Sequence, residues 1–465
     1  MKKNNLLKAI GIMFLIAVLL SWIIPTGSFT SESFSNAGTI PVGIINLFRF
    51  PVMTMQTFVQ YTIVFIAIGI FYGVLNKTGV YDNIVKDIAK KFKGKERIFL
   101  IAITIIYALL GSLTGLSTLM FLTIPFIAAI LLVMGYDKIS TLLATVGALL
   151  VGEAGSIFGF SGAGYIINTF SIKMTDEVIT KIILFIILTG LYVYFVVRKS
   201  KLNKGKTKEE VIPFLVKDTK NKKSKMPLIV ISLLFFIICF VGMYNWYYGW
   251  GIEFFNNLDQ KINNLTIGTY PLLGNILNGI SILGYWGNYE LAIALVMVTI
   301  IIGWVYNVKF DDFIDGVKSG AKEILPVALY ATICNVVFTI MIANQGNMYA
   351  TIVNWLSGIK ATFNIPVTSL IALSGSLFYS DFYYLLNNVS SVVNNYEAIY
   401  YPIAGVLFTG IYGIMMMILP SSVILVAGLK YFGISYTDWL KKIWLYILEA
   451  LVILILVVVI VTMLI

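Results

Sequence analysis

Two carboxylates and several hydroxyl side chains interrupt stretches of this sequence that are otherwise apolar. Glu153 lies in VGEAGSIFGFSGAG (151–164), and Asp381 lies among aromatic residues in ALSGSLFYSDFYYLLNN (372–388). A charged side chain at the centre of a bilayer costs roughly 2.5–3.5 kcal/mol on insertion scales, so both are candidates for coupling Na⁺ or H⁺. The hydroxyl groups of these and related segments could bind a substrate carboxylate. These substrate-binding candidates are Ser112, Thr114, Ser117, Thr118, Ser156, Ser161, Ser376, Ser380, Ser421 and Ser422.

Structural roles compete with these assignments. Glu153 could be neutral and hydrogen-bonded to nearby backbone, and Asp381 could lie in a solvated turn outside the membrane. Gly162 and Gly164 could serve close helix packing rather than a break in a helix. Glu449 is only two turns from a lysine, which is typical of a side chain that snorkels to the interface, so it is not a candidate.

The composition places these segments in a membrane. The chain of 465 residues is 59% hydrophobic and 12% charged, which is more apolar surface than a water-soluble domain can hide. Long apolar runs, such as 9–24, 227–243 and 443–465, can cross a hydrocarbon core about 30 Å thick as helices. Because backbone groups in lipid must pair within their own segment, we expect an all-α polytopic membrane protein.

The basic residues predict the orientation of the chain. With the N-terminus in the cytoplasm, 28 of the 33 Lys and Arg residues fall in cytoplasmic segments, as the positive-inside rule requires. The net charge of +11 therefore reports orientation, and a nucleic-acid partner is not expected. The apolar start could be a signal peptide, but no small-residue cleavage site follows it, so we expect a retained first helix in a bacterial inner membrane.

The two halves of the chain resemble each other in the same order. Residues 58–85 align with 325–353, and a Gly-Ser-Leu turn recurs at 111–113 and 375–377, with an offset of about 265 residues. The first copy starts outside and the second inside. The repeats are therefore predicted to be inverted, an architecture that recurs in secondary transporters.

Each repeat is predicted to contain a re-entrant hairpin and a broken transmembrane helix, although 98–134 could instead form two full spans. The predicted organisation is 1–41, first helix and outside segment; 42–197, repeat 1 with hairpin 98–134 and broken helix 139–170; 198–226, basic cytoplasmic linker; 227–307, two helices around an outside segment; 308–442, repeat 2 with hairpin 363–395 and broken helix 396–429; and 443–465, last helix.

Several stretches, in order along nearly the whole chain, resemble the anaerobic C4-dicarboxylate carrier family, whose YfcC-like branch includes basic amino acid antiporters. They are WIIPTGSF (22–29), GVLNKTGVYDNIV with KFKGKE (73–96), MGYDKI (134–139), SGAKEILPVAL (319–329) and LPSSVILVAGLKYFGISYTDW (419–439). The resemblance implies an ion-transporter-superfamily fold, with two re-entrant hairpins, two unwound helices and often a homodimer. The first tip reads GLSTLMF without carboxylates, and the second reads SLFYSDFYY. Both depart from the family, so its substrate is not carried over.

These features predict a secondary active transporter, not an enzyme, with the bilayer and a small metabolite as partners. No cofactor is expected beyond Na⁺ or H⁺. Hydroxyls and helix N-termini would hold a substrate carboxylate, and a site with carboxylates but no Arg or Lys favours an amino acid over a dicarboxylate. Two alternatives remain, an ion channel and a membrane enzyme acting on a lipid-linked substrate.

Overall fold

The computed structural model describes residues 5–30, 33–159, 164–202, 212–214, 223–268, 270–277, 279–343 and 347–465. Within these residues the chain is mostly helical, and nine helical segments are long and apolar enough to cross a bilayer. They are Asn5–Ile23, Val59–Thr78, Glu96–Thr114, Val178–Lys199, Met226–Met243, Asn288–Val305, Phe310–Ala343, Ala398–Met416 and Tyr436–Leu464. This is the pattern of a multi-pass membrane protein.

The first half of the chain forms helices connected by short turns. Its elements are α1 (Asn5–Ile23), β1 (Thr26–Phe29), β2 (Phe34–Gly38), α2 (Ile44–Thr57), α3 (Val59–Thr78), α4 (Val80–Lys91), α5 (Glu96–Thr114), α6 (Ser117–Val133), α7 (Lys138–Leu142), the π-helix η1 (Leu143–Gly147), α8 (Ala148–Ala154), α9 (Tyr165–Phe170) and α10 (Val178–Lys199).

The second half is also built from helices. Its elements are α11 (Met226–Met243), α12 (Trp246–Trp250), α13 (Phe254–Asn263), α14 (Leu272–Ile276), α15 (Asn288–Val305), α16 (Phe310–Ile333), α17 (Val336–Ala343), α18 (Met348–Ile359), α19 (Ile365–Phe378), α20 (Phe382–Val393), the 3₁₀ turn η3 (Ala398–Tyr400), α21 (Tyr401–Met416), α22 (Val423–Phe432) and α23 (Tyr436–Leu464).

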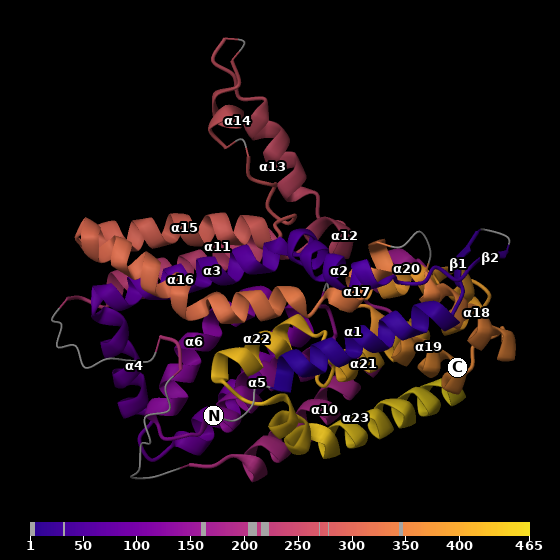
Figure 1. Cartoon of the computed structure of the whole chain (residues 1–465). Coiled ribbons are helices and arrows are strands. Elements are labelled where there is room, and N and C mark those ends of the chain that lie inside the picture. Colours follow the sequence, from indigo (N-terminus) through magenta and orange to yellow (C-terminus); the bar gives the residue numbers. More distant parts are fainter. Residues whose placement is uncertain are drawn as a thin grey trace.

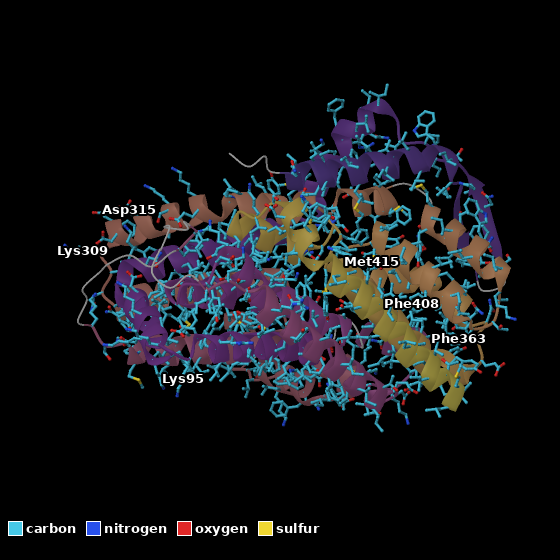
Figure 2. All side chains as sticks on the ribbon, turned by 90° about the horizontal axis from the view of Figure 1, so that it is seen from below. Lys95, Lys309, Asp315, Phe363, Phe408 and Met415 are labelled. Carbon is cyan, nitrogen blue, oxygen red and sulfur yellow. The ribbon has the colours of Figure 1, made fainter. Side chains whose placement is uncertain are left out.

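The helices form an elongated body with a small projecting lobe (Figure 1). Helices α3, α11, α15 and α16 pack against one another along one side, and α10, α21 and α23 pack on the other. Helices α13 and α14 project away from this body. Lys95, Lys309 and Asp315 lie at one end of the body, and Phe363 lies towards the opposite end (Figure 2). This separation agrees with the predicted topology, in which the basic residues mark one side of the membrane.

Glycines allow α3 and α16 to pack closely. A Cβ atom on Gly73 would lie 2.1 Å from the Gly316 carbonyl oxygen, and one on Gly320 would lie 2.1 Å from the Gly69 carbonyl oxygen. Glycine is therefore required for the two backbones to approach this closely. Farther along the pair, the Thr62 and Thr332 hydroxyls are 2.6 Å apart.

Two expectations from the sequence need correction. The fold is not purely helical, because β1 and β2 form an antiparallel hairpin. Its residues carry no strand pattern, and a backbone bridge between Gly27 and Asn347 ties it to a distant segment. Helix α23 begins at Tyr436 instead of 443, because Ser435 caps it by accepting from the Asp438 N–H (3.1 Å).

Candidate functional site

A cavity of about 270 Å³ lies where four interruptions of the helical structure meet. The interruptions are the turn between α5 and α6, the end of α8, the turn between α19 and α20, and the junction between α21 and α22. The cavity is lined by Tyr61, Gly115, Leu116, Ser117, Thr118, Leu150, Glu153, Tyr165, Met243, Ser380, Asp381, Phe382, Thr409, Tyr412, Gly413, Met416, Ser422, Val423 and Ile424.

Ser112, near the end of α5, holds the turn between α5 and α6 in place through hydrogen bonds to the segment that follows α8. Gly115 ends α5 in the left-handed conformation (φ 64°), which a glycine adopts without strain. The Ser112 carbonyl accepts hydrogen bonds from the N–H groups of Ile157, Phe158 and Gly159 at 3.1, 3.1 and 2.9 Å. Its hydroxyl donates to the Gly155 carbonyl (2.7 Å). These bonds satisfy the backbone groups that the end of α8 exposes.

Glu153 lies on the last turn of α8 and faces the same turn. Its carboxylate accepts a hydrogen bond from the Ser117 hydroxyl, at the first residue of α6. Glycines allow this approach, since a Cβ atom on Gly152 would lie 2.0 Å from the Ala108 carbonyl oxygen. Glu153 therefore contacts a side chain on another helix, not only nearby backbone.

Asp381 lies at the turn between α19 and α20. It caps α20 by accepting from the Tyr383 N–H (2.9 Å). The neighbouring Ser380 donates to Asn335 Oδ1 (2.5 Å), at the interruption between α16 and α17. The turn is also anchored on its far side, where the Tyr379 hydroxyl accepts from Asn347 Nδ2 (2.7 Å). Asp381 thus lines the cavity on a turn fixed from two sides.

The junction between α21 and α22 supplies the fourth wall. Ser422 is the N-cap position of α22, but its side chain makes no capping hydrogen bond. The carbonyl groups of Met417 and Ile418, just after α21, accept hydrogen bonds from side chains of α23. Trp439 Nε1 donates to Met417 O (2.8 Å), and the Tyr436 hydroxyl donates to Ile418 O (2.5 Å). The N-terminus of α22 is therefore presented to the cavity.

The structure brings half of the twelve candidate residues to this cavity. Those lining it are Ser117, Thr118, Glu153, Ser380, Asp381 and Ser422. Those buried behind it are Ser112, Thr114, Ser156, Ser376 and Ser421, and Ser161 lies outside the described residues. The buried hydroxyls mostly bond backbone, as Thr114 does to Leu110 O (2.6 Å) and Ser376 to Ala372 O (2.8 Å).

Sequence reasoning missed the aromatic lining of the cavity. Tyr61, Tyr165 and Tyr412 all contribute to it, together with Thr409. Tyr165 also contacts Tyr383 with ring centroids 5.4 Å apart. The only signal for Tyr61 was the polar triplet Gln60-Tyr61-Thr62 at the start of an apolar helix. For Tyr412 we find no signal in the sequence.

A family model described as DcuC, C4-dicarboxylate anaerobic carrier, matches residues 5–380. The chain belongs to this family. The resemblance predicted from the sequence is thereby confirmed.

Two further proteins are similar to this family member. The putative basic amino acid antiporter YfcC of Escherichia coli (strain K12) is 31% identical over 91 residues, which is 20% of this chain and 18% of that protein. The crystal structure of the Alcanivorax borkumensis YdaH transporter, described as revealing an unusual topology, aligns over 98% of both chains with 12% identity and a TM-score of 0.36.

The charged side chains described as lining the cavity of this C4-dicarboxylate carrier family member are all acidic. Two carboxylates line it, and no Lys or Arg is among the lining residues that the structure describes. Lys181, in the first turn of α10, is buried at 8% exposure. It lines a separate, smaller cavity with Ser156 and Thr409, and its Nζ donates to Met174 O (3.4 Å). The central cavity is therefore suited to a ligand that carries positive charge.

Replacing Ser112 with Ala is expected to destabilise this family member, whereas replacing Ser376 is not. Both serines belong to a Gly-Ser-Leu triplet near the end of a helix, α5 or α19, and are fully buried. Ser112→Ala leaves the buried Gly155 carbonyl without its donor, which costs about 1–3 kcal/mol. Ser376 only bonds a carbonyl of its own helix. Thermal unfolding of both variants in detergent tests this, and equal melting temperatures would show that the bond from the Ser112 hydroxyl to the Gly155 carbonyl does not hold the turn.

Proposed function

We propose that the protein is an ion-coupled secondary transporter, a symporter or exchanger, for a small metabolite that carries a carboxylate, with an amino acid favoured over a dicarboxylate. The observation that carries this proposal is the convergence of two hairpin turns and two helix junctions on one cavity with two carboxylates. Interrupted helices expose backbone groups, which membranes tolerate only against protein or a water-filled cavity. Transporters place substrate and coupling-ion sites at such interruptions.

The packing of α3 and α16 supports the proposal of two inverted repeats, 42–197 and 308–442. Thr62 of α3 contacts Thr332 of α16. Farther along the pair, Gly69 packs against Gly320 and Gly73 packs against Gly316. Residue numbers therefore fall along one helix as they rise along the other, so the helices are antiparallel. Equivalent helices related by a two-fold axis in the membrane plane must be antiparallel where they meet. We take α3 and α16 to be such a pair.

The ends of two helices could bind the substrate carboxylate. Helices α6 and α22 both begin at the cavity, and neither has a side-chain cap. Their first N–H groups have no partner within the helix, and the helix dipole favours an anion there. The Ser117 and Ser422 hydroxyls lie at these two N-termini. This arrangement can bind one carboxylate without an arginine or lysine.

The carboxylates and tyrosines could bind the amine. A primary ammonium would pair with Glu153 or Asp381, and the tyrosine rings could add cation–π contacts. A dicarboxylate would instead place a second negative charge near two carboxylates, which is unfavourable. The name of the relative YfcC, a putative basic amino acid antiporter, agrees with this preference. We therefore favour an amino acid, and a cationic one first.

The remaining parts of the mechanism follow from the same arrangement. Na⁺ or H⁺ would be coupled through Glu153 and Asp381, with carbonyl and hydroxyl oxygens as further ligands for Na⁺. Movement of the hairpins 98–134 and 363–395 would open the cavity to each side in turn. We place the protein in a bacterial inner membrane with a cytoplasmic N-terminus, and we propose a homodimer.

A ligand screen by thermal unfolding tests the choice of substrate. We expect lysine or arginine at about 100 times the Kd to stabilise the purified protein, because a ligand at that excess adds about 2.7 kcal/mol to the free energy of unfolding. Succinate should leave the melting temperature unchanged. Each ligand is tested with Na⁺ and with K⁺ as the only cation. Stabilisation by succinate alone would show that the carrier takes dicarboxylates.

A further inference from the structure

Another cavity, of about 340 Å³, lies between α3, α4, α6 and α11. Its residues are Phe71, Tyr72, Leu75, Tyr81, Ile84, Leu122, Thr123, Phe126, Leu228, Ile229, Ser232, Leu233, Phe235 and Phe236. None of them lines the central cavity. It is about twice as large as the roughly 150 Å³ apolar cavity that accommodates benzene in an engineered protein.

Three of the four polar side chains in this wall bond to other protein groups, and Ser232 is the fourth. The Tyr72 hydroxyl donates to Leu122 O (2.7 Å), and the Tyr81 hydroxyl donates to Pro125 O (3.5 Å). The Thr123 hydroxyl is 2.6 Å from the Tyr107 hydroxyl and donates to Met120 O (2.7 Å). The surface offered to a ligand is therefore almost entirely hydrocarbon, which selects an apolar chain or ring.

Part of the cavity wall lies on the exposed apolar face of α11. Ile229 and Leu233 line it and are 45% and 59% exposed. Leu234 and Ile238, on the same helix, are 55% and 51% exposed. Hydrocarbon chains of the bilayer are the apolar molecules present at highest concentration beside such a surface.

An ion pair lies about one helical turn from the cavity lining. Lys225 immediately precedes α11 and pairs with Asp87 of α4. Each of these residues is about one turn from a lining residue, Leu228 in one case and Ile84 in the other. Lys223 is close by in sequence, and its Nζ donates to Tyr306 O (2.6 Å). Cationic side chains at the end of an apolar groove are complementary to an anionic lipid headgroup.

We propose that this cavity is a binding site for one acyl chain of an anionic membrane phospholipid, with the headgroup at Lys225. The chain lies between α6, which carries one side of the turn at the central cavity, and α11, which lies outside both proposed repeats. The lipid therefore contacts the hairpin arm and a helix against which that arm would move. Binding of the lipid does not depend on the substrate proposed above.

Native mass spectrometry of the full-length protein tests the site. The protein is delipidated in detergent and titrated with phosphatidylglycerol or phosphatidylcholine of identical acyl chains. We expect one phosphatidylglycerol to remain bound per chain, with about fivefold preference over phosphatidylcholine, the effect expected of one lysine near a headgroup. Equal, weak binding of both lipids at many sites would overturn the proposal.

Two pairs of variants separate the chain from the headgroup. Ser232→Phe fills the cavity and should abolish the tightly bound lipid, whereas Leu234→Phe, on the exposed face of α11, should not. Lys225→Gln should remove the preference for phosphatidylglycerol but keep binding of the chain, whereas Lys309→Gln should change neither. If Ser232→Phe does not fold, Ile229→Phe serves the same purpose. Wild-type binding in a folded cavity-filling variant would show that the lipid binds elsewhere.

Discussion

Replacing Glu153 with Gln should uncouple uptake from its driving cation and lower the uptake rate at least about tenfold. Gln keeps an oxygen that can accept from the Ser117 hydroxyl, but it carries no charge for a cation or an ammonium group. Loss of a charged hydrogen-bond partner costs about 1.5–3 kcal/mol, and each 1.4 kcal/mol is a factor of about ten. Uptake of labelled lysine or arginine into proteoliposomes, measured over a series of Na⁺ concentrations and pH values, checks this.

Glu449→Gln is the matched control for this experiment. Glu449 is also a carboxylate inside a membrane-spanning helix, α23, but it does not line the central cavity. We expect this variant to keep both the rate and the cation dependence of the wild type. If Glu153→Gln also keeps them, Glu153 has no role in coupling. Asp381→Asn would then be the remaining candidate, and both variants behaving as wild type would reject coupling through either carboxylate.

The elements that carry the site could be predicted from the sequence because their signals are local. Apolar runs marked the helices, and glycine and proline marked the interruptions near Glu153 and Ser422. A carboxylate in an apolar run is costly unless it has a use, which pointed to Glu153 and Asp381 without any knowledge of the fold. Both line the central cavity.

The direction of each hydroxyl could not be predicted, because it depends on how the helices end. Ser421 and Ser422 are neighbours in the sequence, yet only Ser422 lines the cavity. Because the chain between α21 and α22 is not helical, helical spacing does not predict which of the two side chains faces the cavity. Ser112 and Ser117 are separated by the left-handed Gly115, so helical spacing does not relate them. Tyr61 and Tyr412 come from helices that look like ordinary spans in the sequence, and only the packing of distant segments brings them to the carboxylates.

The packing of α3 against α16 leads to the second large expected effect, which is on stability. Replacing Gly320 with Ala should destabilise the protein by about 1–3 kcal/mol, the usual cost of overpacking a filled interior. The added Cβ would lie 2.1 Å from the Gly69 carbonyl oxygen and 2.8 Å from its carbonyl carbon. These are backbone atoms that cannot rotate away, so the two helices must separate. Separation would also stretch the contact between Thr62 and Thr332.

Heating the protein in detergent and measuring the fraction that remains monodisperse by size-exclusion chromatography checks this expectation. Gly190→Ala is the control, because Gly190 lies inside α10 and a Cβ there would meet nothing within 4 Å. Alanine is favoured over glycine in a helix by roughly 0.5–1 kcal/mol, so this variant should be as stable as the wild type or slightly more. Wild-type stability of Gly320→Ala would mean that α3 and α16 are not in close contact. The support that their antiparallel pairing gives to the inverted repeat would then be lost, whatever the result for Glu153.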